Sequence, residues 1–108
     1  VPFAVPPPRV EPIASLRGGR ISQLGDREAA YLQYEQRGQR ISVFVFDPSG
    51  LRLQAPRRAV IHNREVFIQG TRGYHIAVFQ DRDLGYAIAG SVDEPEFIQF
   101  VSAIMRSP

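Results

Sequence analysis

Alternating apolar and polar residues predict short β-strands along most of the chain. The clearest strand covers residues 41–46, where Ile41, Val43 and Val45 lie on one face and Phe44 and Phe46 on the other. Because both faces are apolar, we expect this strand to be central and covered on both sides. Other runs predict strands over residues 19–24, 28–36, 59–62, 65–69, 74–80 and 84–89. The runs at 59–62 and 65–69 form either a hairpin or a bent strand pair, and residues 51–58, which contain a proline, receive no element.

The hydrophobic pattern changes at the end of the chain. Apolar residues recur at positions 97, 100, 101, 104 and 105, which is the spacing of one face of an α-helix. Two capping signals precede this run, Ser91 with Glu94 and Asp93 with Glu96. The predicted fold class is therefore α+β, an antiparallel sheet of about six strands with one C-terminal helix packed on one face.

Length and composition place this fold in one domain. The chain has 108 residues, of which 44% are hydrophobic, and this is enough for a single two-layer core. Prolines at positions 2, 6, 7, 8 and 12 favour an extended start. We predict a proline-rich tether or linker over residues 1–17 and a single α+β domain over residues 18–108. Because the chain begins with Val rather than Met, we expect it to be a piece of a longer protein.

Charge and missing residue types argue against several functions. All basic residues are arginines, and they are spread among the acidic residues, so we predict no nucleic acid partner. The aromatic residues on predicted strands, at positions 31, 34, 44, 46, 74 and 79, are expected in the core rather than exposed for base stacking. Without cysteine the chain has no disulfide, thiolate zinc site or cysteine nucleophile, and without lysine it cannot form the standard phosphate-binding loop.

The other polar residues form no recognisable catalytic or metal-binding motif. His62 and His75 lack a ligand spacing such as His-Glu-x-x-His, and Asp81 and Asp83 flank a hairpin tip, where acids are usually solvated. No serine lies in a Gly-x-Ser-x-Gly elbow. We therefore predict no enzyme activity and no catalytic, cofactor-binding or metal-binding residue in this chain. The candidates for contact with a partner are the adjacent basic pair and the two histidines: Arg57, Arg58, His62 and His75.

The order of the apolar motifs is informative as well. They run as Gly19-Arg-Ile through Tyr34, Arg40-Ile-Ser-Val-Phe-Val-Phe46, Arg72-Gly-Tyr-His-Ile-Ala-Val-Phe79, Asp83-Leu-Gly-Tyr-Ala-Ile88 and a closing helix from Ser91 to Ile104. This series resembles the extracytoplasmic domain of bacterial transmembrane anti-sigma factors of the zinc-binding anti-sigma family. The resemblance covers residues 18–106, with Phe79 where a Trp is common and Gly90-Ser-Val92 in place of Ser-Asp-Leu.

The resemblance implies a membrane-spanning protein that controls an alternative sigma factor. A cytoplasmic zinc module that binds the sigma factor and one transmembrane helix would precede Val1, so neither zinc nor sigma binding is assigned to this chain. The domain would lie on the periplasmic side of the inner membrane, held by the proline-rich tether. There it would sense an envelope condition or a partner and expose the tether to a regulatory protease, and an exposed sheet edge could accept a partner strand.

Two other classes of function stay open at this point. One is a free periplasmic enzyme or ligand-binding domain with no link to a sigma factor, which would need a cleft with convergent polar groups. The other is a module that dimerises through the edges of its sheet. The sequence decides neither the oligomeric state nor the signal.

Overall fold

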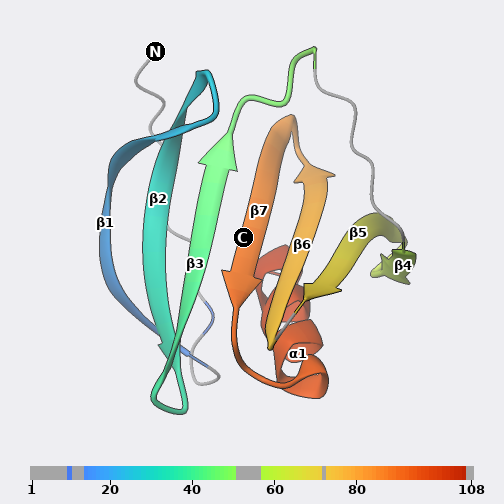
Figure 1. Cartoon of the computed structure of the whole chain (residues 1–108). Helices are drawn as coiled ribbons and strands as arrows, with labels where there is room; N and C mark the ends of the chain where they lie inside the picture. The colour runs from blue at the N-terminus through green and yellow to red at the C-terminus, as the bar shows by residue number, and fades with distance from the viewer. Residues whose placement is uncertain (1–9, 11–13, 51–56, 72, 107–108) are drawn as a thin grey trace.

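Seven antiparallel strands form a single sheet, and one helix packs against one of its faces (Figure 1). The structure is a computed structural model that describes residues 10, 14–50, 57–71 and 73–106. The strands are β1 (Ser15–Leu24), β2 (Arg27–Gln36), β3 (Gln39–Phe46), β4 (Arg57–Ile61), β5 (Arg64–Thr71), β6 (Tyr74–Asp81) and β7 (Leu84–Gly90), and the helix is α1 (Glu94–Arg106). The predicted α+β fold with one C-terminal helix is confirmed, and the described residues form seven strands where about six were expected.

The strand order is β1-β2-β3-β7-β6-β5-β4. The first three strands form one meander and the last four form a second. The two meanders join where β3 pairs with β7. The connection after β3 therefore crosses to the far edge of the sheet, and β1 and β4 become the two edge strands.

Tight two-residue turns connect the strands in three of the hairpins. Both residues of each turn have positive φ: Arg37 and Gly38, His62 and Asn63, and Arg82 and Asp83. Two such residues in sequence define a type I′ turn, whose twist matches that of the flanking strands. The segments at 59–62 and 65–69 are thus a hairpin, in which Ile61 pairs with Arg64.

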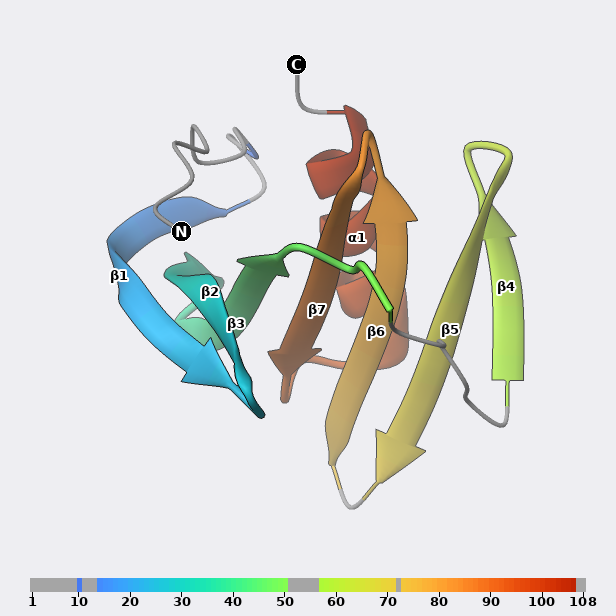
Figure 2. The ribbon, with the colours of Figure 1, turned by 90° about the horizontal axis from the view of Figure 1, so that it is seen from above.

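The core lies between the sheet and α1, which lies along one side of the sheet near β6 and β7 (Figure 2). Tyr34 of β2 is opposite Ile41 of β3, and both side chains are fully buried on this side. The ring of Tyr34 meets Phe100 of α1 edge to face, with 5.4 Å between ring centroids. Burial raises the pKa of the Tyr34 hydroxyl above its ordinary value. The predicted apolar face of α1 is buried, as is Ala103, which was not predicted; the predicted residues are Phe97, Phe100, Val101, Ile104 and Met105.

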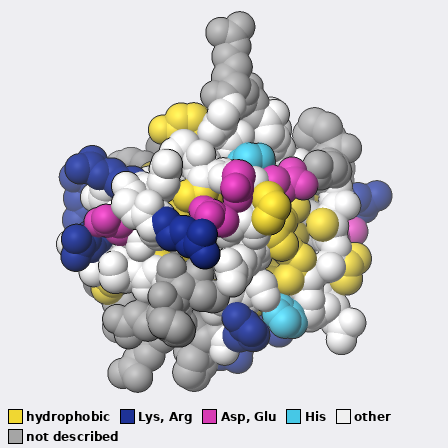
Figure 3. Space-filling view, turned by 90° about the horizontal axis from the view of Figure 1, so that it is seen from below, with side chains coloured by type: hydrophobic (Ala, Val, Ile, Leu, Met, Phe, Trp, Pro, Cys, Tyr) yellow, Lys and Arg dark blue, Asp and Glu magenta, His cyan; other side chains and the backbone are white. Residues whose placement is uncertain are grey.

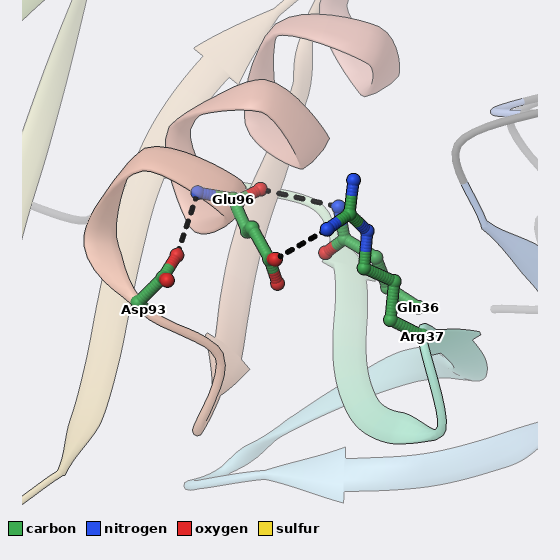
Figure 4. A network of polar contacts seen from close by, with 4 residues as sticks. All are labelled: Gln36, Arg37, Asp93 and Glu96. Atoms are coloured by element: carbon green, nitrogen blue, oxygen red, sulfur yellow. Dashed lines mark hydrogen bonds and ion pairs between the residues drawn. The ribbon is translucent and has the colours of Figure 1, made fainter.

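Polar contacts hold the start of α1 (Figure 4). Asp93 is the N-cap, because its Oδ1 accepts the main-chain N–H of Glu96 at 3.1 Å. Ser91, the other predicted cap, donates instead to a glutamine side chain of β3. The main-chain oxygen of Glu96 accepts a hydrogen bond from Gln36 Nε2 at 3.3 Å. The carboxylate of Glu96 accepts one from the Arg37 guanidinium at 3.2 Å. The turn between β2 and β3 is therefore tied to the first turn of α1.

The first described residues belong to the folded unit. Val10 and Ala14 are 3% and 6% exposed and are part of the core, and β1 begins at Ser15, upstream of the predicted domain start. Most of the predicted tether over residues 1–17 lies outside the described residues. Residues 51–56 of the unassigned segment also lie outside them, whereas Arg57 and Arg58 belong to β4.

Two expectations about the faces of the sheet hold only in part. We expected β3 to be covered on both sides, and on the side away from α1 its Phe46 is buried but its Phe44 is only half-buried. We also expected all strand aromatics in the core. Tyr34 and Phe79 are buried in this core and Phe46 is buried on the other side of the sheet, whereas Tyr31 is half-buried beside Phe44 and Tyr74 is 55% exposed. The reason is that a single helix covers only one face of a sheet this wide.

Candidate functional site

The side of the sheet opposite α1, here called the open face, is apolar along its centre. Alternation along the paired strands places there Tyr31, Ser42, Phe44, Phe67, Ile76, Val78, Ala87 and Ala89. All of these side chains are half-buried. Among the described residues no helix lies over them. A sheet face that only meets water usually carries polar residues, so this composition marks the open face as a candidate binding surface.

An aromatic corner forms the β1–β3 end of the open face. The rings of Tyr31 and Phe44 are 5.0 Å apart between centroids and tilted by 38°. The Tyr31 hydroxyl lies 3.2 Å from Ser42 Oγ, and the guanidinium of Arg20 lies over the Tyr31 ring at 5.0 Å. Tyrosine, phenylalanine and arginine side chains held in this way present a broad, rigid contact area, as in protein interfaces.

The open face also has an excess of positive charge. Glu35 accepts from Arg17 at 2.9 Å, and Glu65 accepts from Arg58 at 3.0 Å. Both pairs are exposed and therefore contribute little to stability. Arg40 lies opposite Glu35 on this face and forms no ion pair with any described residue. The two acids are thus neutralised within the domain, while Arg20 and Arg40 are left to attract an acidic partner.

An open hollow of about 750 Å³ lies at one end of the sheet, where the start of β2, the segment after β3 and the β6–β7 hairpin meet. The guanidinium of Arg27 donates to the main-chain oxygens of Asp47 and Ser49. The carboxylate of Asp47 accepts from the Ser49 N–H at 3.0 Å and the Ser49 hydroxyl at 2.7 Å, and these bonds lower the pKa of Asp47. Gln80 and Asp83 also line the hollow, together with Pro48 and Leu84, so it presents both polar and apolar groups to a small molecule.

The structure corrects the prediction that Asp81 is solvated. Its side chain is 9% exposed and forms an ion pair with Arg64. Burial, together with the negative charge of Asp81, raises the pKa of the nearby Tyr86 hydroxyl. Asp83, on the other side of the hairpin tip, is exposed as expected.

The four predicted contact residues are dispersed. Arg57 and Arg58 lie on the edge strand β4, where Arg58 pairs with Glu65. His62 lies in the β4–β5 turn, with Nε2 2.7 Å from Ser102 Oγ of α1. His75 pairs with Gly70 near the other end of β5, and its Nδ1 lies 3.0 Å from the main-chain oxygen of Val92. In Figure 3 the two histidines appear as separate patches with hydrophobic surface between them. Each histidine joins the sheet to α1 or to the segment before it.

Sequence reasoning missed the surface that the structure favours. The sequence does not show that Arg20, Tyr31 and Phe44 share one face. Their common face follows only from the register of β1, β2 and β3. The signal that could have found them is the apolar second face of residues 41–46, combined with the presence of a single predicted helix.

Within the described residues, no three or more metal-ligating side chains group together, and no helix is long and apolar enough to span a bilayer. Comparisons of the chain with family models, curated proteins and solved structures found no match.

Proposed function

We propose that this chain is the extracytoplasmic regulatory domain of a membrane-anchored anti-sigma factor, and that it acts by binding a protein partner rather than by catalysis. The open face is the observation that carries the proposal. Its apolar centre, bordered by Arg20 and Arg40, has the chemistry of an interface core with a charged rim. Such a surface suits a protein with a complementary apolar patch and acidic flanks.

The proposed signal path runs through the start of the domain. Val10 and Ala14 are buried in the core, so the chain that enters the domain is held by the same packing that supports the sheet. A partner that changes this packing would change the exposure of the tether to a regulatory protease. The sigma factor itself would be bound by a cytoplasmic zinc module upstream of Val1, beyond a transmembrane helix, as the family resemblance implies.

The test uses the full-length protein in its own bacterium, with a reporter that depends on the sigma factor. Val78→Lys places a charge at the centre of the open face and should leave the reporter unable to respond normally. Gln99→Lys, on the exposed side of α1, is the matched control and should respond as the natural protein does. Melting temperatures of the purified domains establish that both variants fold. A normal response from folded Val78→Lys would remove the open face from the mechanism, and a normal response after deletion of the domain would remove the regulatory role.

The coding sequence upstream of Val1 provides a second test. An apolar segment of about 20 residues, preceded by a His- and Cys-containing zinc module, agrees with the proposal. A cleavable signal peptide at that place contradicts it and favours the alternative, a free periplasmic ligand-binding or dimerisation module. The hollow lined by Arg27, Gln80 and Asp83 is the observation that favours ligand binding in that case.

A further inference from the structure

Three of the four large hydrophobic residues exposed in the described part of the chain lie on the two edge strands, and the fourth, Tyr74, begins β6. Leu16 and Ile21 of β1 are 43% and 55% exposed, and Val60 of β4 is 74% exposed. In the described part of the chain, β1 pairs only with β2 and β4 pairs only with β5. Exposed edges are usually protected against pairing with another chain by charged side chains, prolines, bulges or a short strand. Apolar residues at these positions indicate that an edge is used for contact.

The two edges differ in how well they are protected. The arginines of β1 fold inward over β2, since Arg17 donates to Glu35 at 2.9 Å and Arg20 lies 5.0 Å above the ring of Tyr31. These contacts draw both arginine side chains over β2, which leaves the bulge between Leu16 and Gly18 as the protection of β1. The other edge strand, β4, has only five residues. Because a longer strand offers more backbone groups to a partner, β1 is the better pairing edge.

The register of a self-paired β1 is restricted. A β-bulge between Leu16 and Gly18 interrupts the strand, so the regular stretch is residues 18–24. When two copies of one strand pair antiparallel about a two-fold axis perpendicular to the sheet, residues opposite each other must lie on the same face. One residue must therefore lie opposite its own copy, with the axis between them. An axis at Ile21 sets Ile21 against its own copy and Arg20 against Ser22. An axis at Arg20 would oppose two like charges, and an axis at Ser22 would oppose Ile21 to a polar Gln23.

We propose that the chain forms a two-fold dimer in which two β1 strands pair antiparallel about Ile21 and join two sheets into one. The second copy covers both exposed Ile21 side chains and pairs with the edge of β1 that no other described strand occupies. Since the contact is essentially one strand from each copy, we expect a dissociation constant on the order of 10–100 µM. This proposal does not rest on the proposed function, because the edge of β1 and the centre of the open face are separate surfaces.

Sedimentation velocity of the purified domain, from about 5 µM to about 500 µM, tests the dimer. The natural chain should change from monomer to dimer over this range, and Ile21→Lys should stay monomeric. Val60→Lys, which places the same charge on the other edge strand, should dimerise as the natural chain does. A natural chain that stays monomeric throughout, or loss of the dimer in Val60→Lys but not in Ile21→Lys, overturns the proposal. Melting temperatures show whether each variant is folded.

Single-cysteine variants test the register, since the chain has no cysteine of its own. Directly opposite residues of antiparallel strands have Cα atoms about 4.5–5.5 Å apart, within the range of a disulfide. Ile21→Cys should therefore form a disulfide-linked dimer under mild oxidation, in proportion to the dimer present. Ser22→Cys on the same strand should crosslink at least tenfold more slowly, because its partner in this register is Arg20. Equal rates for the two variants would refute the Ile21 register.

Discussion

Gly85 of β7 lies beneath the ring of Phe46 on the side of the sheet away from α1, and this contact allows the packing there to be tested. A Cβ added at Gly85 would lie 2.5 Å from Cε2 and 2.7 Å from Cζ of Phe46. Phe46 is only 2% exposed, so its ring is enclosed and has little room to move. Gly85→Ala is therefore expected to destabilise the domain.

The magnitude follows from the distances. To restore an ordinary contact of 3.4 Å, the Phe46 ring must retreat by roughly 0.9 Å. Overpacking of this kind costs about 1–3 kcal/mol. Replacing a strand glycine by alanine also raises the unfolding free energy by about 0.5–1 kcal/mol, because the unfolded chain becomes less flexible. The net loss in unfolding free energy is then about 0–2.5 kcal/mol, with a central value of about 1 kcal/mol, and each kcal/mol lowers the melting temperature by about 4–8 °C.

Urea unfolding followed by circular dichroism measures this loss. Gly70→Ala is the matched control, because its added Cβ would meet His75 at an ordinary 3.6 Å. In Gly85→Ala combined with Phe46→Leu, the smaller side chain should relieve the clash. The double variant should then be more stable than the two single effects predict by at least about 0.5 kcal/mol. If Gly85→Ala is as stable as Gly70→Ala, the Phe46 ring does not lie over Gly85 and the packing described here is wrong.

Three further predictions concern the helix cap, the buried ion pair and alkaline pH. Asp93→Ala should lower the unfolding free energy by about 0.5–2 kcal/mol and Asp93→Ser by much less, as measured by urea unfolding, because serine can also cap the helix. Arg64→Met should cost about 1–3 kcal/mol, since it leaves the buried Asp81 carboxylate without its partner, whereas Arg58→Ala removes an exposed pair and should cost at most about 1 kcal/mol. Equal losses in these two variants would contradict the burial of Asp81. Stability should fall as pH rises above about 10, because the folded state raises the pKa of Tyr34 and the unfolded chain releases that proton first. Tyr34→Phe should show a smaller fall in urea unfolding at successive pH values, and an unchanged slope would disprove this cause.

The elements themselves could be predicted because their signals are local. Period-two alternation identified the strands, and the spacing of Phe97, Phe100 and Ile104 identified α1. Turn residues separated the hairpins for the same reason, since positive φ at Gly38 or Asn63 is a property of a few neighbouring atoms. The choice between Ser91 and Asp93 as helix cap was not local. It depended on a polar contact between Ser91 and β3, which lies far away in the sequence.

The candidate surface could not be predicted in the same way. Alternation divides a strand into two faces but does not say which face meets the helix, and in β3 both faces are apolar. Burial of Asp81 also needed a partner, Arg64, from another strand. The arginines of β1 look like protecting charges in the sequence. Only their contacts with Glu35 and Tyr31 show that they fold away from the edge.

The sequence by itself therefore determined the strands, the helix and the α+β class, because hydrophobic periodicity and turn chemistry act over a few residues. The tertiary structure decided the strand order, with β3 beside β7 and with β1 and β4 at the edges. It also decided that Tyr31 and Phe44 lie on the open face. These features depend on pairing between segments far apart in the chain, where one register or face is selected by the packing of the whole sheet on a single helix.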